Sequence, residues 1–140
     1  ENYEKAYIDR KKDFTVLRKA NRKVLTMYMG GIYLECLLKT VIIKKFRITK
    51  SILVYEGSRR IIYWYNQTEY MKLKEIDEPD NEDYKKHSSA YNPDHNLIAA
   101  LKQIEELSRT FPSEGIRRLE VLNKPFNRSS TKLRVVTMFR

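Results

Sequence analysis

The sequence predicts a mostly α-helical protein, an up-and-down antiparallel helical bundle with a small β-hairpin insertion. The longest apolar run, Met29–Ile43, covers more than one face of a helix, which is typical of a helix that is packed on most sides. Between residues 48 and 73, β-branched and aromatic runs are separated by turn residues, as in strands. A later segment repeats apolar residues at helical spacing, namely Leu97, Leu101, Ile104, Leu107 and Phe111.

Composition is that of a soluble globular chain. The 140 residues suit a single domain over 1–140, with 41% hydrophobic and 33% charged residues. A lone cysteine, Cys36, lies in the apolar run, where we expect a buried thiol in a reducing, cytoplasmic setting. One Cys and two His have no metal-ligand spacing, and we expect no cofactor. The net charge of +10 favours a partner rich in phosphate, or a basic face that only solubilises the domain.

The first two helices are expected at 3–18 and from Ala20 or Asn21 to about Phe46. Tyr7, Phe14 and Leu17 lie on one stripe of the first helix. In the second, Glu35 and Lys39 stand at i and i+4 in the favourable order for an ion pair. The apolar run is short and is followed by basic residues, so we expect no membrane span.

Residues 47–91 are predicted to be an insertion. Its strands are expected at 51–55, 61–65 and 70–73, with a turn at 56–58, although a helix through 58–74 is an alternative. The acidic, polar stretch 75–92 is predicted to be a mobile loop.

The C-terminal part is predicted to begin with one long helix from Asn92, the expected N-cap, to Phe111. Pro112 interrupts it, and a short helix is expected at 113–123. Weak alternation in 131–140 indicates a strand.

Three short motifs stand out in the predicted helices. The first is a Gly-rich, Tyr-containing helix start followed by Glu, apolar residues and Lys, at Gly30, Gly31, Tyr33, Glu35, Leu38 and Lys39. The second is His95-Asn96-Leu97 with Leu101 one turn later, and the third is Leu119–Phe126 followed by Arg128. Together they resemble the motifs of HEPN domains (higher eukaryotes and prokaryotes nucleotide-binding). The resemblance covers roughly 3–46 and 92–128 and leaves the insertion unexplained.

This resemblance implies a bundle of four or five antiparallel helices that forms homodimers and handles RNA or nucleotides. It also implies a nucleotidyltransferase-type protein partner, or a place in a defence or toxin–antitoxin system. Catalytic HEPN members are metal-independent ribonucleases with Arg four to six residues before His. Neither His87 nor His95 has an Arg four to seven positions upstream, so we expect a non-catalytic domain that binds RNA or nucleotide.

Two other functions stay open. In the first, the chain is a ribonuclease with a composite site, for which Arg117 or Arg128 approaches His95. In the second, it is a protein–protein interaction module whose apolar β insertion is the interface.

The candidate binding residues each have a structural alternative. Glu35 and Lys39 line a cleft or form a buried pair that fixes helix register. His95 contacts phosphate at a helix start, or packs on the central helix and bonds a carboxylate such as that of Glu35. The remaining candidates for RNA or nucleotide binding are basic residues of the C-terminal quarter, Arg117, Arg118 and Arg128.

Aromatic side chains gather beside Arg59 and Arg60 in the insertion, at Tyr55, Tyr63, Trp64 and Tyr65. Aromatics interleaved with Arg suit the stacking of single-stranded nucleic acid. The alternative is a sheet face that packs on the bundle or on a second subunit.

Overall fold

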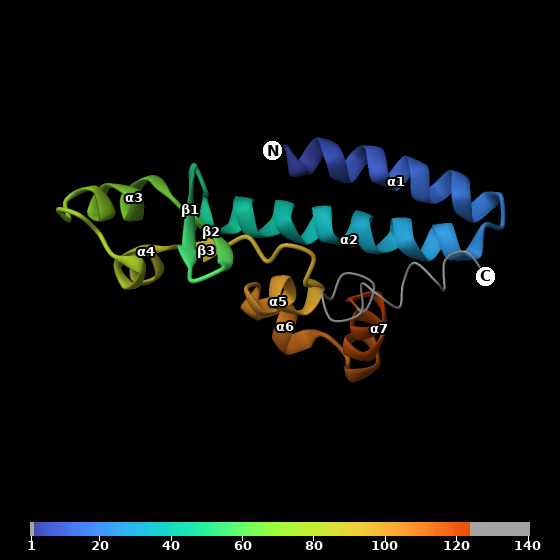
Figure 1. Cartoon of the computed structure of the whole chain (residues 1–140). Helices are drawn as coiled ribbons and strands as arrows, with labels where there is room; N and C mark the ends of the chain where they lie inside the picture. The colour runs from blue at the N-terminus through green and yellow to red at the C-terminus, as the bar shows by residue number, and fades with distance from the viewer. Residues whose placement is uncertain (1, 124–140) are drawn as a thin grey trace. The chain divides into compact units, whose positions relative to one another are not determined.

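The computed structural model describes residues 2–123. In this part of the chain the helices are α1 Tyr3–Lys19, α2 Lys23–Phe46, α3 Gln67–Lys74, α4 Asn81–His87, α5 Leu97–Lys102, α6 Glu105–Thr110 and α7 Ser113–Asn123 (Figure 1). The strands β1 Lys50–Glu56, β2 Arg59–Tyr65 and β3 Ala90–Tyr91 form one antiparallel sheet in that order. The predicted mostly α-helical fold with a small β-hairpin insertion is confirmed. The strand expected at 131–140 lies outside the described residues.

The chain divides into two compact units. The helical unit contains the described residues up to Thr40 and from Pro93 onward, and the inserted unit is Val41–Asn92. The inserted unit covers the segment that the sequence predicts as an insertion, 47–91.

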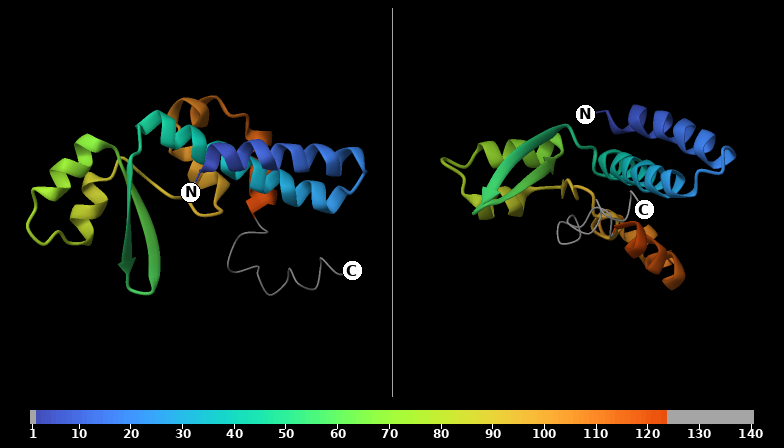
Figure 2. Two further views of the ribbon diagram at one scale, coloured as in Figure 1. Left: turned by 90° about the horizontal axis from the view of Figure 1, so that it is seen from above. Right: turned by 45° about the vertical axis from the view of Figure 1, so that its right-hand side comes forward.

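The helical unit is built on the antiparallel pair α1 and α2, which lie side by side in Figures 1 and 2. The ring of Tyr33 on α2 stacks between two rings of α1, at centroid distances of 5.2 Å from Tyr7 and 5.9 Å from Phe14. A Cβ atom at Gly30 would lie 3.2 Å from the Phe14 ring, so the glycine allows α1 to approach closely. The predicted Tyr7–Phe14 stripe therefore faces α2.

The expected start of α2 at Ala20 or Asn21 is wrong by two or three residues. Ala20 ends α1, and Asn21 has φ of 54°, in the left-handed region that Asn tolerates better than most residues. The chain reverses there, and α2 begins at Lys23. By length and composition α2 is apolar enough to cross a membrane, a test that the core helix of a globular protein also passes. The short apolar run Met29–Ile43 was expected to exclude a membrane span. Because α2 is longer than that run, its length does not exclude one.

The single helix predicted from Asn92 to Phe111 is wrong. Asp94 is left-handed (φ 51°), and Asn96, not Asn92, caps α5 by accepting from the Ala99 amide at 3.0 Å. Ile104 (φ −107°, ψ 82°) then separates α5 from α6. Leu97, Leu101 and Ile104 are buried, whereas Leu107, which a straight helix would place on the same stripe, is 36% exposed. The short helix predicted at 113–123 is confirmed as α7.

In the inserted unit, β1 and β2 pair through a two-residue turn in which Gly57 has a positive φ of 61°. Helices α3 and α4 contact these strands (Figure 1). The unit's core contains Val54, Tyr63, Tyr65 and Leu73.

Two predictions for this unit are wrong. Residues 70–73 belong to helix α3 rather than a strand, since the Asn66 side chain caps the helix by accepting from the Glu69 amide at 2.9 Å. The stretch 75–92 is not simply a loop, because Asp80 and Asp83 form a capping box that starts α4 and Ala90–Tyr91 pairs with β2.

Candidate nucleic-acid interface

Three of the predicted site residues meet in the helical unit. On α2, Oε1 of Glu35 accepts a hydrogen bond from the Lys39 ammonium at 2.6 Å. Oε2 of the same carboxylate lies 2.8 Å from Nδ1 of His95. The Lys39 ammonium also lies over the Tyr3 ring, 5.0 Å from its centroid. A carboxylate only accepts hydrogen bonds, so this contact places a proton on Nδ1 of His95.

The three side chains differ in burial, and this difference indicates different roles. Glu35 and Lys39 are 8% and 4% exposed, so their charges are turned toward each other and away from solvent. This arrangement is what the structural alternative for the pair requires, since a buried charge needs a close partner. The His95 side chain, by contrast, is 59% exposed. Of the three, only the imidazole offers a large surface to a ligand.

Two of the predicted arginines lie on α7. Arg117 and Arg118 are exposed residues of α7, and the Arg118 guanidinium lies 3.3 Å from Glu114 one turn earlier. Arg128 lies outside the described residues.

The aromatic residues of β2 do not form a stacking platform. Tyr63, Trp64 and Tyr65 are at most 5% exposed, so this face is packed, as the alternative expected. Tyr63 and Tyr65 belong to the core of the inserted unit, so no second subunit is needed to cover them. The Tyr65 hydroxyl donates to the Tyr84 carbonyl at 2.7 Å, and burial raises the pKa of its phenol. Burial also raises the pKa of Tyr63, whose hydroxyl bonds Glu56 at 3.2 Å.

A group of cations that the sequence analysis missed lies at the reversal between α1 and α2. We define the basic turn as Arg18, Lys19, Arg22 and Lys23, which are all exposed. None of these four side chains forms an ion pair with an acid in residues 2–123, whereas Arg10 and Lys12 on the same α1 do. The sequence does contain a signal for the basic turn. Four cations occupy six positions around Asn21, and Asn tolerates the left-handed backbone of a turn.

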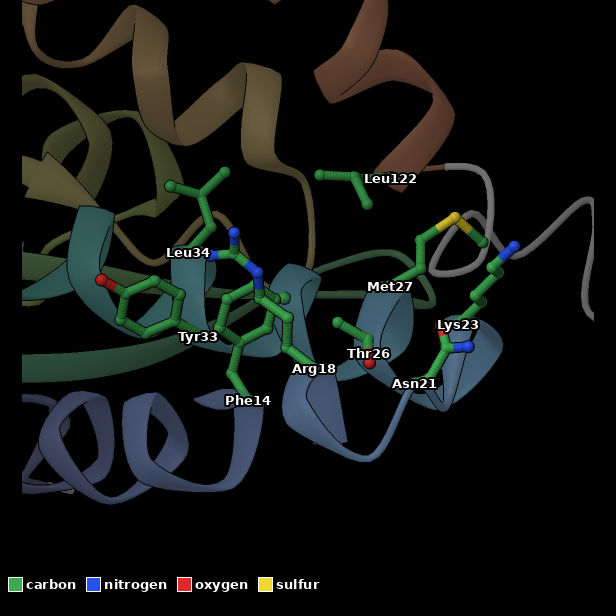
Figure 3. Close-up of a pocket in the computed structure, with 10 residues that line it drawn as sticks. Phe14, Arg18, Asn21, Lys23, Thr26, Met27, Tyr33, Leu34 and Leu122 are labelled. Atoms are coloured by element: carbon green, nitrogen blue, oxygen red, sulfur yellow. The ribbon is translucent and has the colours of Figure 1, made fainter. Parts of the chain in front are cut away.

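A pocket of about 530 Å³ opens beside the basic turn, and we call it the turn pocket (Figure 3). Its apolar part comes from α1, α2 and α7 and consists of Phe14, Met27, Gly30, Tyr33, Leu34 and Leu122. Its polar part consists of Arg18, Asn21, Lys23 and Thr26. No acidic residue lines it among the residues described, so its charge is positive.

Metal chemistry has no obvious ligands in the described part, since no group of three or more His, Cys, Asp or Glu side chains is gathered within residues 2–123. Comparison with family models, curated proteins and solved structures found no match to this chain.

Proposed function

We propose that the helical unit is a non-catalytic domain that binds RNA through its phosphates. The observation that carries the proposal is the basic turn, whose four exposed cations have no acidic partner in the described chain. Phosphate contacts by Lys and Arg supply most of the sequence-independent affinity for nucleic acid. The HEPN-like motifs at Gly30–Lys39 and His95–Leu97 support RNA as the polyanion.

Some cations of the helical unit form ion pairs with acidic residues and others do not, and this difference supports a specific location for binding. Surface cations that already face a carboxylate gain less from a phosphate, because the existing pair must be broken. In the helical unit, Arg10, Arg109 and Arg118 each face an acid of their own helix. At the basic turn no such pair has to be broken, and four cations lie within six positions of the chain.

The test is RNA binding by the whole chain, measured by fluorescence anisotropy with a labelled single-stranded oligonucleotide at several salt concentrations. Replacing the four cations of the basic turn with Gln should weaken binding at every salt concentration. If all four contact phosphates, the slope of log K against log salt should fall in magnitude by about 3. The matched control removes four exposed cations from the inserted unit, Lys72, Lys74, Lys85 and Lys86. An equal loss in both variants would show that only net charge matters and would refute the proposal.

A second function is favoured by one observation, the contact between His95 and Glu35. A carboxylate that orients an exposed imidazole is the arrangement of a general base, which in RNA cleavage takes the proton of the 2′-hydroxyl. The same oligonucleotide, incubated with EDTA and resolved on a denaturing gel, tests it. Cleavage that is lost in His95→Ala and retained in His87→Ala would replace the non-catalytic proposal, and intact RNA would exclude this second function.

A further inference from the structure

The turn pocket combines an aromatic wall with a cationic rim. Phe14 and Tyr33 are half-buried and stacked at 5.9 Å with an interplanar angle of 18°, so the wall is held in place by α1 and α2 together. In Figure 3 the Phe14 and Tyr33 rings lie together, with the Arg18 side chain extending past them and Lys23 at the N-terminal end of α2. Exposed cations thus lie beside an apolar, half-buried surface.

Two uncharged polar groups complete the rim. Asn21 is exposed, and its side-chain amide offers both donors and an acceptor. The Thr26 hydroxyl donates to the Arg22 carbonyl at 2.8 Å, so its oxygen remains able to accept a hydrogen bond. A ligand matching these features has a flat or apolar body, a polar edge and a negative charge beside it.

We propose that the turn pocket receives one unstacked nucleobase of single-stranded RNA while the basic turn holds the adjacent phosphates. This inference rests on the proposed function and adds the class of RNA that is bound. The volume of about 530 Å³ lies within the range of small-molecule sites and is large enough for a base with its ribose. An acyl chain would fill the apolar wall but would leave the Asn21 amide and the Thr26 oxygen unused.

The consequence is a preference for single strands. In a duplex the bases are stacked and paired, so none can enter a side pocket without the cost of extruding it. Stacking of a base on an aromatic side chain contributes about 1–3 kcal/mol by alanine substitution, which corresponds to roughly five- to 150-fold in affinity. The phosphate contacts of the basic turn do not make this distinction.

The experiment compares three RNAs of equal length with the whole chain: a single strand, its duplex, and an abasic strand. We expect the single strand to bind about tenfold more tightly than the other two. Phe14→Leu should remove most of that difference. The matched control is Tyr7→Leu, which removes a ring stacked on the other side of Tyr33, 5.2 Å away, but not part of the pocket.

A second variant keeps the test valid if Phe14→Leu fails to fold. Asn21 already has a positive φ, so Asn21→Gly preserves the turn and removes only the amide from the rim. It should weaken binding of the single strand more than that of the abasic strand.

The outcomes separate the two proposals. Equal binding of all three RNAs, with no effect of Phe14→Leu or Asn21→Gly, overturns the base pocket but leaves phosphate binding at the basic turn intact. Failure of every RNA to bind overturns both. If dodecanoate displaces a bound base probe, 2-aminopurine riboside monophosphate, but adenosine monophosphate does not, the pocket takes an acyl chain and the inference is wrong.

Discussion

The Nδ1 atom of His95 lies 2.8 Å from Oε2 of Glu35, although 60 positions separate the two residues along the chain. Oε1 of the same carboxylate accepts a hydrogen bond from Lys39 at 2.6 Å. Glu35 therefore joins the middle of α2 to the segment that enters α5. Because Glu35 and Lys39 are almost fully buried, we expect substitutions of this carboxylate to change mainly the stability of the helical unit.

Glu35→Gln should destabilise the protein by about 3–5 kcal/mol, because it leaves the Lys39 ammonium buried without a counter-charge. Lys39→Met should cost a similar amount for the opposite reason. The double variant Glu35→Leu with Lys39→Met should lose much less than the sum of the two single effects, since no buried charge remains. Urea unfolding followed by circular dichroism measures each value, and strict additivity would show that the pair is not coupled.

The sequence predicted the contacts that depend on spacing within one helix. The i, i+4 order of Glu35 and Lys39 and the stripe of Tyr7 and Phe14 follow from helical geometry, and the structure has both pairs where the periodicity places them. The partnership of Glu35 with His95 was one of two open alternatives for that histidine. Periodicity could not decide between them because the contact depends on how α2 meets a distant segment.

The errors arose where one local backbone choice overrides periodicity. Ile104 leaves the helical region and divides a continuous apolar stripe into α5 and α6, without any Pro or Gly to signal it. Asn66 and Asp80 cap short helices in a region whose β-branched and polar composition suggested strands and a loop. The basic turn was missed for the same reason, since residues 18–23 are compatible with a helix except for the left-handed Asn21.

Gly115 on α7 is predicted to resist substitution because of the Phe111 ring. A Cβ atom at this position would lie 2.6 Å from Cε1 of Phe111, far inside contact distance. Gly115→Ala should therefore destabilise the protein, although Ala is favoured over Gly inside a helix by about 1 kcal/mol. In a Phe111→Leu background the same substitution should instead stabilise by up to that amount. Thermal unfolding of the four proteins tests this, and a stabilising Gly115→Ala in the native background would contradict it.

Asn123, the last residue of α7, is predicted to contribute to the stability of the helical unit. Its side-chain oxygen accepts from the Leu97 amide at 2.6 Å and its amide donates to Asn96 at 3.0 Å, so it fastens α7 to the start of α5. Asn123→Ala should cost about 1–3 kcal/mol, since the half-buried Leu97 amide contact loses its acceptor. Glu120→Ala, an exposed change one turn earlier, is the control and should have little effect. Equal destabilisation by the two variants would show that the hydrogen bonds of Asn123 do not stabilise the contact between α7 and α5.

The buried phenol of Tyr65 predicts a loss of stability at alkaline pH. Burial raises the pKa of Tyr65, and the neighbouring Tyr63 and Tyr84 raise it further, whereas the unfolded phenol titrates near pH 10. Below about pH 10 both states keep the proton, so this contribution to the free energy of unfolding is fully present. Above it the unfolded state loses the proton first, and the free energy of unfolding falls as pH rises.

Tyr65→Phe separates this effect from other alkaline effects. The variant should be less stable by about 1 kcal/mol at neutral pH, because the hydrogen bond to the Tyr84 carbonyl is lost. Its stability should then fall less steeply than that of the native protein above about pH 10, because one buried phenol no longer titrates. Tyr55→Phe, at a side chain that is 61% exposed, should keep the native pH dependence. Urea unfolding at a series of pH values gives the three profiles, and parallel curves for Tyr65→Phe and the native protein above pH 10 would show that ionisation of Tyr65 does not drive the alkaline loss.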